Sequence, residues 1–119
     1  MYGLSKETDL SFLVGKQIIQ VALGLYDVQL NWRGGGISIW SKFTFGPAGS
    51  SDHIVWTQGN PEAACCTAGL LRTTIAGAEC TAEGTLLVRF SDGSLLELFE
   101  DPLYESFSIN DKNRLGILI

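Results

Sequence analysis

Side chains that bind transition-metal ions or take part in nucleophilic catalysis are scarce in this chain. It has one histidine, His53, and three cysteines, at positions 65, 66 and 80. A zinc site needs about four such ligands in spaced pairs, and two of these cysteines are adjacent, so we expect no metal and no other cofactor. The serines beside His53 lack the G-x-S-x-G frame of a hydrolase nucleophile. We therefore predict that the protein is not an enzyme.

Long hydrophobic runs are absent as well. Hydrophobic residues make up 45% of the sequence, but charged residues interrupt them, so we expect no membrane span. The apolar run 12–14 is far too short for an export signal, and an odd number of cysteines is a poor disulfide framework. Both features predict a cytoplasmic protein. A length of 119 residues is typical of one domain, which we place at 1–119.

Basic residues are few, and their shortage is confined to one half of the chain. Lys and Arg number 8 against 13 Asp and Glu, for a net charge of −5. Residues 1–59 hold four bases and four acids, so the whole excess lies in residues 60–119. Phosphate groups need clustered Lys and Arg, so we expect no direct contact with nucleic acid. A cationic protein partner is favoured instead.

Alternation of apolar and polar residues predicts that most of the chain forms antiparallel β-strands. Residues 19–23 and 28–32 alternate, and the glycines at 34–36 return the chain into one strand over 37–45. Asp92-Gly93 closes a second hairpin, between 86–90 and 94–100. The run 115–119 is apolar throughout, which predicts a central strand covered on both faces. Two further short strands are predicted, at 53–59 and 104–110.

The predicted fold class is α+β. Asn60-Pro61-Glu62 has a capping residue, a proline at the first helical position and an acid in the first turn, which predict one α-helix from about 61 to 71. We expect a twisted antiparallel β-sheet of about six to eight strands, as a half-barrel or a sandwich, with this helix packed on it. The two hairpins align at an offset of 58 residues, which fits an internal duplication and chance similarity equally well.

Negative charge is concentrated in the segment LLELFEDPLYESF, residues 95–107, which contains no Lys or Arg. Exposed acids among aromatic residues are typical of a surface that docks a cationic protein, because the charge speeds encounter and the aromatic rings supply contact area. An ordinary solvated edge strand, protected from aggregation by its charges and its proline, explains the same pattern. The predicted partner-binding residues are Glu97, Glu100, Asp101, Tyr104 and Glu105.

Three segments, 10–32, 86–101 and 102–109, together resemble a family of small uncharacterised bacterial domains that carry a D-G-S hairpin and a Y-E-S-F-S-I segment. That resemblance implies no activity and no site residues. In size, acidity and lack of a catalytic cluster, the chain also resembles in type the cytoplasmic immunity proteins of contact-dependent growth-inhibition toxins. Many of those toxins are nucleases with basic clefts, which their immunity proteins cover with acidic surfaces.

Three hypotheses for the function follow from these observations. The first is an acidic protein-binding module, an immunity protein that occludes the active site of a basic, nuclease-like toxin domain. The second is a small enzyme or ligand carrier with a pocket in the curved sheet, lined by Trp32, Trp40 and Trp56. The third is a self-associating scaffold domain.

Overall fold

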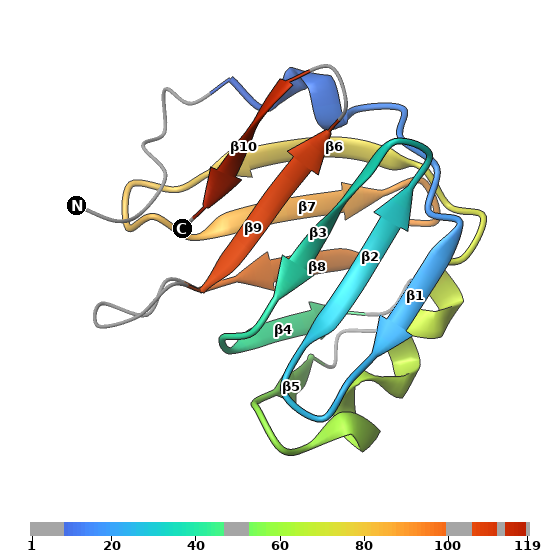
Figure 1. The fold of residues 1–119 in the computed structure, drawn as a ribbon, viewed down its shortest axis with the longest axis vertical. Coiled ribbons are helices and arrows are strands. Elements are labelled where there is room, and N and C mark those ends of the chain that lie inside the picture. Colours follow the sequence, from blue (N-terminus) through green and yellow to red (C-terminus); the bar gives the residue numbers. More distant parts are fainter. Residues whose placement is uncertain (1–8, 47–52, 100–105, 112–113, 119) are drawn as a thin grey trace.

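Two antiparallel sheets lie face to face in the computed structural model, which describes residues 9–46, 53–99, 106–111 and 114–118 (Figure 1). Each sheet has five strands, and the strands of one sheet run across those of the other. The first sheet has the order β1 (Gln20–Leu23), β2 (Val28–Trp32), β3 (Gly35–Ile39), β9 (Phe107–Asp111) and β10 (Arg114–Leu118). The second sheet has the order β5 (Ile54–Trp56), β4 (Phe43–Gly46), β8 (Leu95–Leu98), β7 (Leu86–Phe90) and β6 (Ile75–Cys80).

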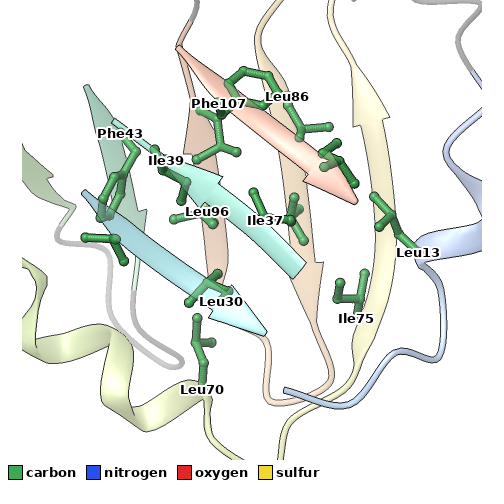
Figure 2. Close-up of a cluster of buried hydrophobic side chains, with 14 of the residues drawn as sticks. Leu13, Leu30, Ile37, Ile39, Phe43, Leu70, Ile75, Leu86, Leu96 and Phe107 are labelled. Atoms are coloured by element: carbon green, nitrogen blue, oxygen red, sulfur yellow. The ribbon is translucent and has the colours of Figure 1, made fainter. Parts of the chain in front are cut away.

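The hydrophobic core lies between the two sheets, and the alternation seen in the sequence builds it. On β2 every second residue is buried, and β7 has the same pattern, so each strand turns one apolar face inward. Leu30 and Ile37 from the first sheet and Leu86 and Leu96 from the second belong to this cluster (Figure 2). Each such side chain contributes about 1.5–3 kcal/mol of burial free energy, so this layer is the main stabilising feature.

Both predicted hairpins are confirmed, and each places its glycine where a positive φ is needed. Trp32 pairs with Gly35, so Arg33 and Gly34 form the first turn, and Gly34 has φ 91°. Gly93, in the second turn, has φ 92°. The 58-residue offset holds only for the outgoing strands β2 and β7. The return strands align at an offset of 59, because Leu30 pairs with Ile37 whereas Val88 pairs with Leu96.

The predicted single strand over 37–45 is wrong, and the reason explains the second sheet. The chain bends at Trp40 and Ser41, whose backbone N–H groups both donate to the carbonyl oxygen of Ser106, at 3.0 and 3.1 Å. Before the bend the chain belongs to β3 in the first sheet, and after it to β4 in the second. The described residues therefore form ten strands rather than six to eight, and of the two predicted arrangements, a half-barrel or a sandwich, the half-barrel is wrong.

The predicted α-helix is also corrected: Pro61–Leu70 forms a 3₁₀ helix, η2, and the described ranges contain no α-helix. The helix begins at the expected proline, but Asn60 makes no side-chain cap. Its buried residues are Ala64, Thr67 and Leu70, spaced by three, which matches the three residues per turn of a 3₁₀ helix. The helix packs against the edge strands β1 and β5, one from each sheet. The fold is thus antiparallel β rather than α+β.

Three strand positions differ from the predictions. β8, which contains the first part of the acidic segment, lies between β4 and β7, so the alternative of a solvated edge strand does not hold for it. β10, predicted to be central, lies at the edge of the first sheet and pairs with β9 alone. β6 was not predicted and forms the edge of the second sheet, where the short 3₁₀ helix η1 (Ser11–Leu13) packs against it. No helix in the described part of the chain is long and apolar enough to span a membrane.

Candidate functional site

Glu97 lies in the middle of the outer face of the second sheet. On β8 the side chains of Leu96 and Leu98 are buried in the core, so Glu97 points the other way. It is half-buried and sits across from Thr44 on β4 and Leu87 on β7. A carboxylate with strands on both sides is held in a defined place, unlike one on a frayed edge. The other predicted partner-binding residues, Glu100, Asp101, Tyr104 and Glu105, lie outside the described residues.

Hydrophobic side chains surround Glu97 on this outer face. Leu87 and Leu95 are half-buried beside it, and Val55 on the edge strand β5 is 48% exposed. Phe99, the residue after β8, is half-buried as well. The solvated face of an antiparallel sheet normally carries polar residues at such positions. We call this surface the Glu97 face and define it by Thr44, Val55, Leu87, Leu95, Glu97 and Phe99.

The outer face of the first sheet provides the contrast. On β2, β3 and β9 its outward positions hold uncharged polar residues or glycine, which is the usual composition of a face that meets water. They include Gln29, Asn31, Ser38, Ser108 and Asn110. The outward positions of β2, β3 and β9 are therefore polar, whereas the outer face of the second sheet has apolar side chains around Glu97, with the exposed ion pair of Arg89 and Glu79 beside them.

Cations near the Glu97 face are directed at other groups. The ammonium of Lys42 lies over the ring of Phe99, 5.1 Å from its centroid. Arg89 forms an ion pair with Glu79 at 2.5 Å, and both side chains are more than half exposed. Among the residues that the structure describes, Glu97 has no ion pair. It is the charge on this face that remains available to a partner.

A buried carboxylate that the sequence analysis missed lies at the far end of the core. Asp111 occupies the inward face of β9 with Phe107 and Ile109, and only 7% of the residue is exposed. Its Oδ1 accepts a hydrogen bond from the indole N–H of Trp32, at 3.2 Å, and lies 3.4 Å from Nζ of Lys16. The period of the strand, which places residues 107, 109 and 111 on one face, is the signal that could have found it.

The tryptophans do not line a common pocket. Trp56 is fully buried and stacks on Phe43, with ring centroids 5.1 Å apart, so it is a core residue. Trp32 is 3% exposed and is tied to Asp111, whereas Trp40 lies at the bend between β3 and β4. The predicted pocket of Trp32, Trp40 and Trp56 is therefore not formed as one site.

The cysteines are free thiols in separate surroundings. Cys65 is exposed, Cys66 is half-buried and Cys80 is buried. Burial raises the pKa of the Cys66 thiol, and the neighbouring Cys65 adds to this effect. Within the described ranges no three His, Cys, Asp or Glu side chains gather as metal ligands would.

Comparison with known protein families gives a match over most of the chain. Residues 10–118 match the model of a family described as a family of unknown function, DUF6188. No curated protein and no solved structure matches the chain. The role of the Glu97 face must therefore be argued from its own geometry.

Proposed function

Because this chain belongs to DUF6188, a family of unknown function, we propose its role from the molecule itself: a protein-binding module that docks through the Glu97 face. The observation that carries this proposal is the apolar surface around Glu97 on the outside of the second sheet, where a solvated sheet would be polar. Interfaces have a largely apolar centre in which charges are few and specifically paired. The Glu97 face has that composition.

The energetics support a contact in which the apolar residues supply affinity and Glu97 supplies selectivity. Leu87, Leu95 and Phe99 are each only half-buried in the free protein, so docking would remove more of their apolar area from water, at about 25 cal/mol per Å². A carboxylate enclosed by such a contact needs a cation or a strong donor, because an unpaired buried charge costs several kcal/mol. The Glu97 face therefore favours a partner with Lys or Arg opposite Glu97.

We further propose that the partner is a basic protein, as in an immunity protein that covers the active site of a nuclease-like toxin domain. The net charge of −5, with its whole excess in residues 60–119, supports this partner because opposite net charges accelerate diffusional encounter. The remaining predicted contact residues, Glu100, Asp101, Tyr104 and Glu105, follow Phe99 directly in sequence. In this role the protein acts by occlusion and needs no catalytic group.

The test uses the full chain and a basic protein domain encoded by the neighbouring gene, with binding kinetics measured by biolayer interferometry at several salt concentrations. Charge reversal of Glu97 with Glu100 should slow association about ten-fold or more and flatten its salt dependence. Reversal of Glu62 with Glu83 is the matched control, because both are exposed and neither is one of the residues that define the Glu97 face. If the two double variants associate at the same rate, net charge alone guides the encounter and the Glu97 face is not the contact.

A separate variant tests the apolar part of the contact. Leu87→Ser with Leu95→Ser should accelerate dissociation about ten-fold or more, because these side chains act after encounter. Self-association through the same face is the competing outcome, since an apolar surface also fits a second copy. Sedimentation of the wild-type chain alone decides it: a dimer that Leu87→Ser and Leu95→Ser convert to a monomer would replace the basic partner with a second copy.

A further inference from the structure

Among the side chains that the structure describes, positive charge is concentrated at one place away from the Glu97 face. The structure describes five Lys and Arg side chains, those at positions 16, 33, 42, 72 and 89. Three of them, Lys16, Arg33 and Arg72, line two adjoining hollows at one end of the sandwich. In a chain of net charge −5, such a concentration needs an explanation of its own.

Residues of the segment 15–19, which crosses from the second sheet to the first, line both hollows. At its start Gly15 donates its backbone N–H to Ile75, at 2.8 Å, and next Ile18 donates to Thr73, at 2.9 Å. At its end Ile19 donates to Asn31 on β2, at 2.9 Å. The segment is thus pinned to both sheets, and the side chains that it presents are held in place.

The two hollows adjoin each other, because Gln17 and Ile19 line both of them. The first hollow, of about 470 Å³, is also lined by Lys16, Trp32 and Arg33. The second, of about 320 Å³, is also lined by Leu71 and Arg72. We call the two adjoining hollows together the crossover groove. None of its lining residues belongs to the Glu97 face, so an inference about it does not rest on the proposed function.

The three basic side chains of the crossover groove differ in whether an acidic side chain pairs with them. Lys16 is partly neutralised by the buried Asp111. Arg33 and Arg72 are exposed, and neither has an ion pair within the part of the chain that the structure describes. Both guanidinium groups are therefore available to an anion, one in each hollow.

Arg72 is held in a conformation that a residue with a side chain seldom adopts. Its φ is 74°, in the left-handed region, which for a residue other than glycine costs about 1 kcal/mol or more. Its backbone N–H donates to Ile18 at 2.9 Å, and its carbonyl accepts from Nε2 of Gln17 at 3.3 Å. Glycine would remove the strain but would also remove the guanidinium beside the groove.

Apolar side chains lie between these charges. Ile19 is 57% exposed and Leu71 is 44% exposed, and both line the hollow that contains Arg72. Such exposed side chains make the groove open, whereas a small-molecule site buries most of its ligand. An extended chain segment, which lies along a surface and presents both charged and apolar groups, fits this shape better.

We propose that the crossover groove binds an acidic peptide segment in which carboxylates flank an apolar side chain. The carboxylates pair with Arg33 and Arg72, whose planar guanidinium groups match a carboxylate in two-point hydrogen bonding. The apolar side chain packs on Ile19 and Leu71. A nucleic acid strand fits less well, because Trp32 is too buried to stack with a base and the net charge of −5 opposes a polyanion.

The experiment measures fluorescence anisotropy of a fluorescein-labelled peptide in which pairs of glutamates flank two leucines, titrated with the full chain at low salt. Arg33→Glu with Arg72→Glu should weaken binding about ten-fold or more. Lys42→Glu with Arg89→Glu is the matched control, because it changes the net charge equally outside the groove and should weaken binding far less. Circular dichroism and thermal unfolding confirm that each variant is folded.

Two further binding measurements test the proposal, one with a variant of the apolar residues and one with a nucleic acid probe. Ile19→Ser with Leu71→Ser should weaken peptide binding about five-fold, since both apolar surfaces are lost. A labelled oligothymidine should bind much more weakly than the peptide. The proposal is overturned if the wild-type chain does not bind the peptide, if the groove and control reversals weaken it equally, if the serine variant binds as well as wild type, or if oligothymidine binds as tightly. Any of these results leaves the tests of the Glu97 face unaffected.

Discussion

Replacement of Gly35 by alanine should destabilise the protein strongly, because β3 and β9 approach each other too closely for a side chain there. Gly35 pairs with Asp111 across these strands. A Cβ at this position would lie 2.1 Å from the carbonyl oxygen of Asn110 and 2.8 Å from Nε1 of Trp32. Real Cβ atoms essentially never come within 3.0 Å of another heavy atom, so the strands must separate by about 1 Å.

The expected loss can be worked from the two contacts. Overpacking of a tight site costs about 1–3 kcal/mol. The displaced indole also weakens its hydrogen bond to the Asp111 carboxylate, which is worth about 1.5 kcal/mol or more because the acceptor is charged. We therefore expect the free energy of unfolding to fall by about 2–4 kcal/mol, and Tm to fall by roughly 8–16 °C for a domain of this size.

Gly77→Ala is the matched control, because Gly77 also lies within a strand but a Cβ there meets nothing within 4 Å. Glycine in a strand is less stable than alanine by about 0.5–1 kcal/mol, so this change should leave stability unchanged or raise it. Urea unfolding followed by tryptophan fluorescence measures both variants. If Gly35→Ala stays within about 0.5 kcal/mol of Gly77→Ala, the close approach of β3 and β9 is wrong.

Two further predictions concern Lys16 and Cys66. Lys16→Met should lower the free energy of unfolding by about 1–3 kcal/mol, because it removes the cation that pairs with the buried Asp111. Arg89→Met removes a cation from an exposed pair and should lower the free energy of unfolding by less than about 1 kcal/mol. Equal losses of the two variants in urea unfolding would contradict this difference. Burial raises the pKa of the Cys66 thiol, so less of the reactive thiolate is present near pH 8 in the folded protein. In a Cys65→Ser variant, iodoacetamide should therefore alkylate Cys66 several-fold more slowly in the folded protein than in the urea-unfolded chain. Mass spectrometry measures the two rates. The same raised pKa means that stability is full at neutral pH and falls as pH rises, since the unfolded thiol loses its proton first; pH-independent unfolding across the alkaline range would count against it.

Local pattern was sufficient to predict both hairpins and the position of the helix. The alternation in 28–32 and 86–90 fixed which side chains share a face, and Gly34 and Gly93 marked the turns because their φ values suit glycine. Pro61 marked the start of the helix but not its type. Whether such a turn of chain becomes 3₁₀ or α depends on what its side chains pack against, which is not a local property.

The sequence also led to Glu97 as a candidate contact, and here the structure added what local reasoning could not. Alternation places Glu97 opposite the buried Leu96 and Leu98, but it does not say which strands lie beside β8. The neighbours on β4 and β7 come from segments about 50 and 10 residues earlier in the chain. Only the pairing of β8 with β4 and β7 places Thr44 and Leu87 on either side of the Glu97 carboxylate. The apolar part of the face comes from Leu87 together with Leu95, Val55 and Phe99.

What the sequence by itself determined is therefore the two hairpins, their turns and the inward or outward sense of the side chains on their strands. Those features depend on neighbours within a few residues, through backbone geometry and the period of two. Only the tertiary structure decided that residues 35–46 belong to two sheets, that Asp111 faces Lys16 and Trp32, and that Arg33 and Arg72 line adjoining hollows. The physical reason is that strand partners are chosen by long-range packing of the whole core, which no short window of sequence contains.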